Sequence, residues 1–310
     1  MTVKLGLVGT GTVGGGCIDI LKNHREDFKR HYGIDVELVR VCSRNPEQAI
    51  AHGVEDFFTQ DYQDILNDPD IDIVVELIGG PTVARDIVVG ARTAGKNVVT
   101  AHKAPMATYG EEVMGAADEA GKEIAFEASV GGGIPIIRPI SQCLAANEMT
   151  EIAGILNGTT NFILTKMIRE HMAFADALKL APQLGYAERD PSADVEGVDA
   201  CRKICILASL AYGTHVYPDG VHTEGITAIT KEDVGYADAW GGVIKLIGEV
   251  KKLENGRIHI QVAPMFLSRE SPLANVDDVL HGILVRGDAT GAVVFHGKGE
   301  AKLPTARAVA

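Results

Sequence analysis

A glycine-rich turn close to the N-terminus limits this chain to a small number of folds. Gly9-Thr-Gly11-Thr-Val-Gly14 follows the β-type run Val3–Val8 and leads into a segment with apolar residues at helical spacing. Such a G-x-G-x-x-G turn between strand and helix is typical of dinucleotide-binding folds, where the glycines permit a tight turn and a close approach to pyrophosphate. The predicted cofactor-binding residues of this turn are Gly9, Thr10, Gly11, Thr12, Val13 and Gly14. Two more glycines, Gly15 and Gly16, are costly in a helix, and we attribute them to crowding against the sheet.

Strand-like runs alternate with helical patterns over residues 1–128. The runs are Val36–Cys42, Ile71–Ile78, Gly95–Thr100 and Glu123–Phe126, and helices are expected at about Pro81–Ala94 and Tyr109–Ala120. Asn45-Pro46 supplies an N-cap and a first-turn proline for a further helix. This alternation predicts βαβ units and an α/β domain with a Rossmann-type, doubly wound parallel sheet.

The pattern changes after a glycine-rich crossing, Ser129–Ile137, which resembles a hinge between domains. Residues 129–294 combine longer helices with strands, which predicts an α+β second domain. The expected helices are Phe162–His171, Phe174–Leu184, Glu196–Tyr212 and Asp233–Leu246, and the expected strands include Ile258–Val262 and His281–Val285. Trp240, within the last of these helices, is expected in the core or at a subunit contact rather than at a cofactor.

The charge balance excludes several classes of partner. The chain has 310 residues, with 29 Lys and Arg against 42 Asp and Glu, and a formal net charge of −13. Such an acidic chain is a poor candidate for binding nucleic acid or an anionic membrane. The N-terminus runs directly into the strand-like segment Val3–Val8, so no signal peptide is expected, and no apolar run is long enough to cross a bilayer. Five scattered cysteines without a CxxC pair fit buried thiols in a reducing compartment. We therefore expect a soluble cytoplasmic protein.

The end of the second strand bears on the choice of cofactor. An Asp or Glu there would select NAD through its ribose hydroxyls, but the strand ends in Ser43-Arg44. A hydroxyl and a guanidinium suit a 2′-phosphate. NADP is therefore favoured over NAD. The alternative interpretation of Arg44 is a solvated charge in a loop.

Three polar segments beyond the turn are candidates for chemistry. Lys103 is expected in a loop past the carboxyl end of a predicted parallel strand, where ligands of such sheets bind. Gly185–Asp194 is a loop rich in carboxylates. Asp199 and Lys203 lie at i and i+4 at the start of a helix that is apolar nearly all round and therefore buried. Such a lysine could be tuned for proton transfer, and the other interpretation of the pair is a structural ion pair.

At these segments, and along its whole length, the chain resembles the homoserine dehydrogenase family. The matching stretches are Gly9–Gly14, Val74–Gly80, Asn97–Ala104, Phe126–Ile137, Gly154–Leu164, Gly185–Glu188, Glu224–Thr227, Leu284–Asp288 and Pro304–Ala306, with Asp190, Pro191, Asp194, Gly197, Asp199, Arg202 and Lys203. The resemblance implies NAD(P)-dependent interconversion of L-homoserine and L-aspartate 4-semialdehyde, a step toward threonine, methionine and isoleucine.

The resemblance also implies roles for individual residues. Lys203 is expected to be the proton donor and acceptor, with Asp199 orienting it and Lys103 at the junction of nicotinamide and substrate. Glu188 is expected to grip the substrate amino group, and Asp194 and Gly185 belong to the same substrate site. Further expected cofactor contacts are Ser43, Arg44, Gly79, Lys103 and Gly299, and a sodium ion is expected on main-chain oxygens of Glu127, Val130, Gly132 and Ile134.

The same resemblance extends to domains and assembly. It implies an NAD(P)-binding domain at residues 1–128, a catalytic and dimerisation domain at 129–294, and a C-terminal segment, 295–310, that returns toward the cofactor domain. A homodimer or homotetramer is expected, because strands between Ile258 and Val294 would otherwise leave an exposed edge. The chain ends at Ala310 without the ACT regulatory domain of many family members, so threonine feedback by that route is not expected.

Two departures and two alternatives accompany the resemblance. His102 stands where the family usually has Asn, which could alter hydrogen bonding in the nicotinamide pocket, and Gly297–Lys302 replaces a more glycine-rich stretch. One alternative is another Rossmann oxidoreductase, such as an aspartate or inositol-type dehydrogenase. The Glu188, Asp199 and Lys203 constellation, together with the Asn157–Thr160 segment, argues against it. The other is a non-catalytic cofactor sensor, against which the two retained lysines argue.

Overall fold

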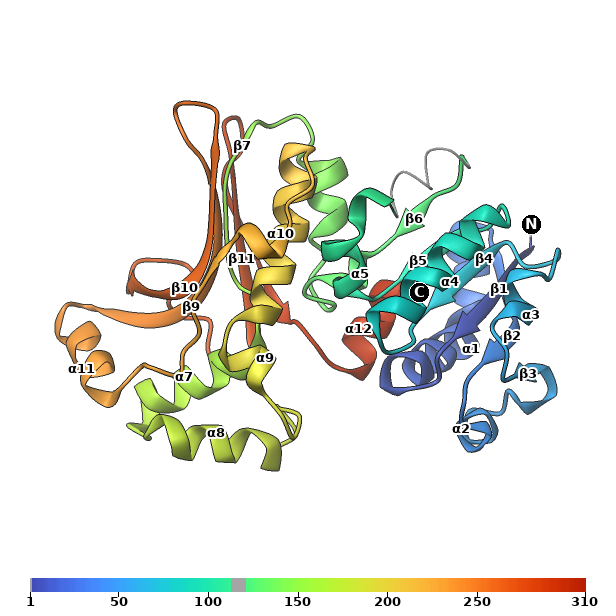
Figure 1. Cartoon of the computed structure of the whole chain (residues 1–310), viewed down its shortest axis with the longest axis horizontal. Coiled ribbons are helices and arrows are strands. Elements are labelled where there is room, and N and C mark those ends of the chain that lie inside the picture. Colours follow the sequence, from blue (N-terminus) through green and yellow to red (C-terminus); the bar gives the residue numbers. More distant parts are fainter. Residues whose placement is uncertain (1, 113–120) are drawn as a thin grey trace. The chain divides into compact units, whose positions relative to one another are not determined.

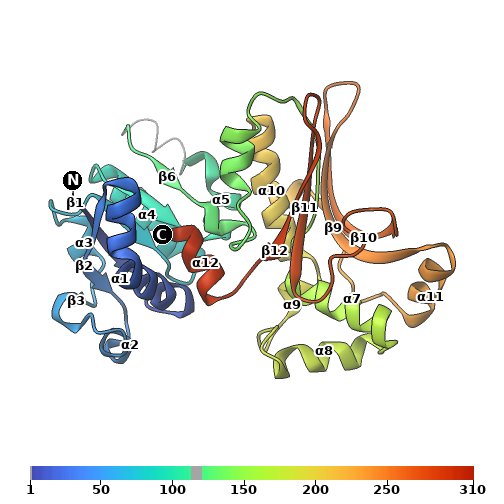
Figure 2. The ribbon, with the colours of Figure 1, turned by 180° about the vertical axis from the view of Figure 1, so that it is seen from behind.

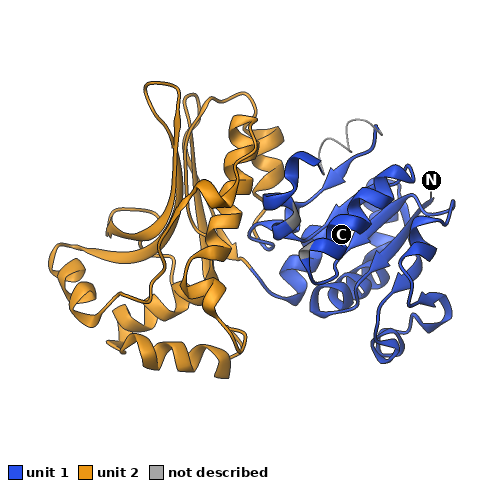
Figure 3. Ribbon diagram, in the orientation of Figure 1, with its two compact units in different colours: residues 1–133, 300–310 blue, residues 134–299 orange. Residues whose placement is uncertain are grey.

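The chain folds into two compact units (Figure 3). The structure is a computed structural model that describes residues 2–112 and 121–310. Unit 1 consists of residues 1–133 and 300–310, and unit 2 of residues 134–299. Within the described ranges, no helix is long and apolar enough to cross a membrane.

Unit 1 contains a parallel sheet of six strands in the order β3-β2-β1-β4-β5-β6. The strands are β1 (Thr2–Val8), β2 (Asp35–Cys42), β3 (Phe58–Thr59), β4 (Ile73–Glu76), β5 (Asn97–Thr100) and β6 (Ile124–Ala125). The described helices are α1 (Thr12–Tyr32), α2 (Pro46–Ala51), α3 (Gln63–Leu66), α4 (Pro81–Thr93), α5 (Lys103–Thr108) and α12 (Lys302–Val309). Helices α1 and α12 cover one face of the sheet and α4 covers the other (Figures 1 and 2). The expected doubly wound, Rossmann-type domain is confirmed.

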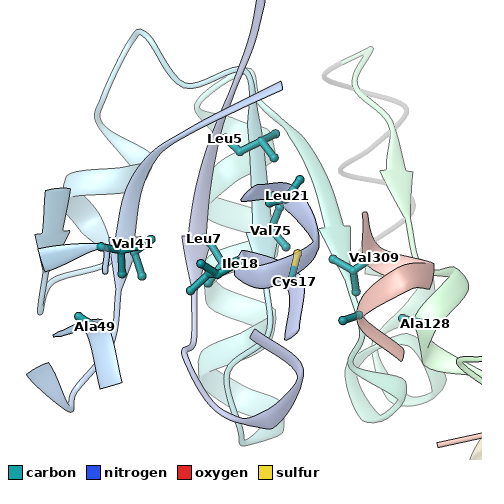
Figure 4. Packing of buried hydrophobic residues seen from close by; sticks show 12 residues of the cluster. Leu5, Leu7, Cys17, Ile18, Leu21, Val41, Ala49, Val75, Ala128 and Val309 are labelled. Atoms are coloured by element: carbon teal, nitrogen blue, oxygen red, sulfur yellow. The ribbon is translucent and has the colours of Figure 1, made fainter. Parts of the chain in front are cut away.

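The core of unit 1 contains residues from both its N-terminal part and its C-terminal helix. Leu7 of β1 and Ile18 of α1 are fully buried, and Val309 of α12 belongs to the same cluster (Figure 4). The C-terminal helix packs along α1, so it completes the hydrophobic cover of the N-terminal sheet. This packing leaves no room for a side chain at Gly16, where a Cβ would lie 3.0 Å from the Cβ of Ala306, and the His52 ring leaves none at Gly15, where a Cβ would lie 2.4 Å from it. The interpretation of these glycines as crowding against the sheet is therefore wrong.

Unit 2 is built on a second sheet of six strands, in the order β12-β11-β7-β9-β10-β8. Its strands are β7 (Met149–Ile155), β8 (His222–Thr223), β9 (Gly242–Lys252), β10 (Ile258–Ser268), β11 (Leu280–Gly287) and β12 (Gly291–Lys298). Its helices are α7 (Gly158–Glu170), α8 (Phe174–Gln183), α9 (Ser192–Val195), α10 (Val198–Tyr212) and α11 (Lys231–Ala239). All strand pairs are antiparallel except β8 with β10. Helix α10 packs on β7 and β9, and helix α7 packs on β9 and β11 (Figure 1). The expected α+β character is confirmed.

Four local expectations need comment. The single helix predicted over Asp233–Leu246 is wrong, because α11 ends at Ala239 and β9 begins at Gly242. Trp240, expected in the core or at a subunit contact, follows α11 with 74% of its surface exposed. Cys143 is exposed, whereas the other four cysteines are buried. The helix expected at Tyr109–Ala120 lies largely outside the described residues.

Candidate active site

At the glycine turn of unit 1, two glycines pack closely against the backbone, whereas Gly11 and the nearby Gly79 face open space. Gly9 has a φ of +105°, and a Cβ there would lie 2.5 Å from the carbonyl oxygen of Leu77. A Cβ on Gly14 would lie only 1.8 Å from the carbonyl oxygen of Gly9. By contrast, nothing lies within 4 Å of a Cβ on Gly11 or Gly79. Since α1 begins immediately after Gly11, its free N–H groups and this open backbone form a cradle that fits a pyrophosphate.

A small polar cluster lies where β1 and β2 end. Thr10 Oγ1 lies 2.7 Å from both Ser43 Oγ and Gln48 Oε1. Ser43 Oγ also accepts a hydrogen bond from the Asn45 N–H at 3.2 Å. Arg44 is exposed beside it. The predicted residues Thr10, Ser43 and Arg44 are therefore brought together at the carboxyl edge of the sheet.

Lys103 also lies at this edge of unit 1. It was expected in a loop, but it is the first residue of α5, which follows β5 after two residues. Its Nζ lies 3.5 Å from Glu300 Oε1, and both side chains are partly exposed. Its position past a parallel strand is compatible with a ligand-facing role.

In unit 2, Lys203 is the centre of a buried polar network. Its Nζ lies 2.7 Å from Asp199 Oδ2 and donates to the carbonyl oxygen of Leu156 at 2.8 Å. Asn157 Nδ2 donates to Asp199 Oδ2 at 3.0 Å and to Asp194 Oδ1 at 2.8 Å. Only 1% of the Lys203 side chain and 6% of the Asp199 side chain are exposed. Burial disfavours a charged ammonium and the adjacent carboxylate favours it, so the protonation of Lys203 is set by two opposing effects.

The local folds of α7 and α10 hold this network in place. Asn157 caps α7, its Oδ1 accepting from the Thr160 N–H at 2.9 Å, which leaves its amide nitrogen for the two aspartates. Helix α10 starts after Gly197, whose φ of +83° is in the left-handed region. A Cβ on Gly197 would lie 3.2 Å from Thr223. Asp199 therefore lies in the first turn of α10 and Lys203 one turn later.

The loop that carries the predicted substrate residues is attached to α7. Thr159 Oγ1 donates to the carbonyl oxygen of Tyr186 at 2.7 Å, and the rings of Phe162 and Tyr186 lie 5.1 Å apart. Gly185, at the start of the loop, has a φ of +76°. Glu188 is exposed on this loop, whereas Asp194 near its end is joined to the Lys203 network through Asn157.

Sequence reasoning missed two members of this network, Leu156 and Asn157. The Asn157-Gly-Thr-Thr stretch does carry a signal, since Asn directly before a helix is a capping residue. The use of the Leu156 carbonyl by Lys203 depends on the packing of β7 against α10 and has no local signal.

The predicted sodium segment is divided between the two units, with Glu127, Val130 and Gly132 in unit 1 and Ile134 in unit 2. In unit 1, Glu127 and Val130 are buried, and a Cβ on Gly132 would lie 2.7 Å from Thr305 Oγ1. Ser129 Oγ in the same segment is buried, with no hydrogen-bond partner among the described residues. In unit 2, Ile134 is buried. The described residues contain no group of three or more His, Cys, Asp or Glu side chains able to hold a metal ion, so a cation here would depend on carbonyl oxygens.

Gly299 was predicted to contact the cofactor. In unit 2 it lies directly against the ring of His281, because a Cβ on Gly299 would come within 1.7 Å of His281 Nδ1. The absence of a side chain at this position is therefore explained by packing within unit 2.

Comparison with known proteins connects both units to one family. The family model described as homoserine dehydrogenase matches residues 135–310, and that of the homoserine dehydrogenase NAD-binding domain matches residues 9–127. The homoserine dehydrogenase of Pseudomonas aeruginosa is 43% identical over 307 residues, covering 99% of this chain and 70% of the relative. That of Synechocystis is 45% identical, covering 100% of this chain and 72% of the relative.

Solved structures agree with the sequence relatives. A homoserine dehydrogenase from Thiobacillus denitrificans has a TM-score of 0.96 at 44% identity, covering 100% of this chain and 72% of that one. A hyperthermophilic archaeal homoserine dehydrogenase in complex with NADPH has a TM-score of 0.84 at 28% identity, covering 100% of this chain and 95% of that one. Similarity of this extent in sequence and fold leaves one conclusion: the chain belongs to the homoserine dehydrogenase family of NAD(P)-dependent oxidoreductases, which interconvert L-homoserine and L-aspartate 4-semialdehyde.

Proposed function

We propose that Lys203 is the proton donor and acceptor of this reaction, positioned by Asp199. The supporting observation is the buried network in which the lysine contacts a carboxylate and a main-chain carbonyl at hydrogen-bond distance. Asp199 in turn accepts a hydrogen bond from Asn157, which fixes the position of its carboxylate. The ammonium of Lys203 is therefore held between this carboxylate and the Leu156 carbonyl. An ion pair of purely structural function would be the simpler interpretation in another family, but an oxidoreductase of a hydroxyl group requires a proton carrier.

The reaction balances with one hydride and one proton. The turn from Gly9 to Gly14 would hold the dinucleotide, and its nicotinamide would supply the hydride chemistry at the carbon that carries the oxygen. In the oxidation of homoserine, neutral Lys203 accepts the hydroxyl proton; in the reduction of the semialdehyde, its ammonium returns that proton to the aldehyde oxygen. The carboxylate of Asp199, 2.7 Å from Lys203 Nζ, stabilises the charged form of the lysine.

We propose that the remaining polar residues bind the substrate. Carboxylates suit the α-ammonium group of homoserine, and Glu188, Asp194 and the backbone at Gly185 belong to one loop attached to α7. We assign Glu188 to the ammonium group, because its side chain is exposed and free to reach a ligand. Lys103 we assign to positioning the nicotinamide and the substrate.

We propose NADP as the preferred cofactor. Ser43 Oγ accepts from the Asn45 N–H and lies beside Thr10 Oγ1, and Arg44 is exposed next to it. A hydroxyl and a guanidinium at this edge suit a 2′-phosphate, whereas an acid would repel it. The archaeal relative found in complex with NADPH is compatible with this choice. Gly9 to Gly14 and Gly79 would take the rest of the dinucleotide, and Gly299 remains a candidate contact.

We further propose a structural sodium ion, an oligomer and a cytoplasmic location. Main-chain oxygens of Glu127, Val130, Gly132 and Ile134 are the candidate ligands, and the unsatisfied Ser129 hydroxyl supports a polar occupant in this segment.

The assembly would be a homodimer or homotetramer. The acidic charge and free cysteines fit the cytoplasm, where the reaction would serve threonine, methionine and isoleucine synthesis. In domain terms, residues 1–128 would bind the cofactor, 129–294 would carry catalysis and dimerisation, and 295–310 would return to the cofactor domain.

The experiment that tests the proposed function is a homoserine oxidation assay with the purified protein. We expect reduction of NADP⁺ that depends on L-homoserine and is lost in Lys203→Met. A wild-type protein that binds NADP⁺ without oxidising homoserine would contradict the assignment and favour a cofactor sensor.

A further inference from the structure

A completely buried carboxylate lies at the carboxyl end of β4, outside the network around Lys203. Glu76 has no exposed surface and ends the strand that pairs with β1. Its Oε1 accepts from the Ile78 N–H at 2.8 Å, and its Oε2 accepts from Thr100 Oγ1 at 2.6 Å. The third group on this carboxylate is His102, whose Nδ1 lies 3.0 Å from Oε1.

These contacts fix the orientation of the His102 ring. Oε1 of Glu76 already accepts from the Ile78 N–H, so it is an acceptor, and Nδ1 carries the hydrogen in this contact. The backbone of His102 is held as well, because its N–H donates to Thr100 Oγ1 at 3.0 Å. In the neutral ring, Nε2 is then a hydrogen-bond acceptor. The side chain is 24% exposed although Glu76 beneath it is fully buried.

The sheet order places this acceptor with respect to the bound dinucleotide. Pyrophosphate belongs at the glycine turn after β1, and the adenosine ribose belongs at the end of β2. The other half of the cofactor must therefore extend over the ends of β4 and β5, on the opposite side of β1. Glu76 and Thr100 are paired neighbours at the last positions of these two strands, and His102 follows two residues later.

We propose that His102 is a cofactor-binding residue whose Nε2 accepts a hydrogen bond from the nicotinamide riboside half, with Glu76 as the positioning residue that fixes its tautomer. The proposal depends on the proposed function only for NADP as the ligand. Two groups of that half offer a hydrogen, the carboxamide NH₂ and the ribose hydroxyls.

Three substitutions at His102 separate its two nitrogens. His102→Asn keeps a donor near the position of Nδ1 and loses the outer nitrogen, His102→Gln keeps a polar atom near Nε2, and His102→Phe has neither. We expect His102→Asn and His102→Phe to weaken NADP⁺ binding about three- to tenfold in titration calorimetry, as for the loss of one neutral hydrogen bond. His102→Gln should stay within about twofold of wild type.

The matched ligand control is 2′-phospho-ADP-ribose, which lacks the nicotinamide. Its affinity should be unchanged in all three variants. Wild-type NADP⁺ affinity in His102→Asn, or an equal loss for 2′-phospho-ADP-ribose, would overturn the proposal. The 3-acetylpyridine analogue of NADP⁺ lacks the amide NH₂ and therefore distinguishes the two possible donors. If the carboxamide is the donor, His102→Phe should leave the affinity for the analogue unchanged. If a ribose hydroxyl is the donor, His102→Phe should weaken binding of the analogue as much as binding of NADP⁺.

A second measurement does not depend on cofactor binding. Nitrogen NMR of the cofactor-free protein should show His102 with its hydrogen on Nδ1, and His102 in the other tautomer would overturn the role of Glu76. These results are independent of the catalytic assignment, because a protein that fails to oxidise homoserine can still show the expected NADP⁺ affinities. Conversely, an active enzyme with unchanged affinities in His102→Asn would refute only the His102 contact.

Discussion

At the scale of single residues, the assignment of Lys203 leads to a kinetic prediction. Methionine fills the volume of the buried lysine stem but has no proton to carry. Lys203→Met should therefore lower kcat by about 10²–10⁴-fold, as expected for loss of a general acid–base group, with NADP⁺ affinity nearly unchanged. Asp199→Ala should have a smaller effect, because it removes the partner and leaves the lysine. The measurement is steady-state oxidation of homoserine with parallel cofactor titration.

The control for this prediction is the other lysine, Lys103. Lys103→Met should raise KM for substrate or cofactor more than Lys203→Met does, since its proposed role is positioning. In wild type, a neutral lysine base gives a rising limb in the pH–rate profile of oxidation. Near-normal turnover in Lys203→Met with the same rising limb would transfer the proton-carrying role to Lys103.

The cofactor preference leads to a second prediction at a single residue. Arg44→Ala should weaken the binding of NADP⁺ by roughly 1.5–3 kcal/mol, which is the usual contribution of a hydrogen bond to a charged group. NAD⁺ lacks the 2′-phosphate, so its affinity should change little. Calorimetric titration of both cofactors checks this, and an equal change for the two would identify Arg44 as a surface charge.

The limits of sequence reasoning at this scale are visible in the Lys203 network. The i, i+4 spacing of Asp199 and Lys203 and the apolar residues that follow predicted a buried pair, and the pair is buried. The link from Asn157 to Asp194 and Asp199 joins residues that are 37 and 42 positions apart. Such contacts follow from the packing of α7, α9 and α10, which no local pattern specifies.

At the scale of elements, the glycine turn predicts different outcomes for two glycines of one motif. Gly11→Ala meets open space and an allowed backbone, with a φ of −64°, so the melting temperature should be unchanged while NADP⁺ affinity falls. Gly14→Ala would press its methyl group against the Gly9 carbonyl and should lower the stability of unit 1. Thermal unfolding combined with cofactor titration separates the two effects. Equal destabilisation by both substitutions would contradict this account of the turn.

The sequence predicted the elements of unit 1 better than the region of α11 and β9 in unit 2. Strand–helix alternation is a strong signal because parallel strands require crossovers. In Asp233–Leu246, apolar residues at helical spacing continue past Ala239 and suggest one helix. Gly241 has a φ of +81°, which is not compatible with a continuous α-helix. The residues that follow it pair with β10 along the whole length of β9. Short apolar runs are compatible with helix and strand alike, and long-range pairing decides between them.

A buried lysine away from the active-site network gives a prediction about the connection between β10 and β11. Lys245 in β9 is completely buried and donates to the Val276 carbonyl at 2.7 Å and to Asp277 Oδ1 at 3.0 Å. Burial lowers the pKa of Lys245. Lys245→Met leaves the carbonyl without this donor and should cost about 2–4 kcal/mol of unfolding free energy in urea. The matched control is Lys252→Met in the exposed pair with Glu148, which should change stability by no more than about 0.5 kcal/mol.

The same ion pair has a definite dependence on pH. Burial alone would raise the pKa of Asp277, but hydrogen bonds and charges from Lys245 and Arg169 outweigh it and lower the pKa below the ordinary 3.8. A lowered folded-state pKa stabilises the protein above the unfolded value, and this stabilisation is lost as the pH falls below about 3.8. Urea midpoints of Lys245→Met should therefore fall less steeply in this acid range than those of wild type. A parallel decline of the two proteins would mean that Lys245 does not set the ionisation of Asp277.

At the scale of the whole molecule, each unit depends on contacts between distant parts of the chain. Helix α12 completes the core of a unit that otherwise consists of the first 133 residues. In unit 2, β11 pairs with β7, more than 120 residues earlier in the sequence. Composition and periodicity indicated an α/β half and an α+β half. The strand order of the second sheet could not be read from them, because antiparallel pairing has no crossover rule that restricts its topology.

The last prediction concerns assembly in solution. Strand β12 is an edge of the second sheet, with eight residues and a largely exposed set of side chains. Unpaired edges of this length favour association, and pairing across a two-fold axis satisfies their backbone groups. Light scattering at micromolar concentration should therefore give at least twice the chain mass of 32.9 kDa.

Hydrogen exchange tests the same prediction at the strand itself. If β12 is covered in the oligomer, its amides that do not bond to β11 should exchange more slowly at concentrations that favour association than after dilution. Amides of the α11 surface, where Trp240 is exposed, provide an internal comparison. A monomer mass would remove the oligomer altogether. An oligomer with fast-exchanging outer amides in β12 would mean that another surface forms the interface.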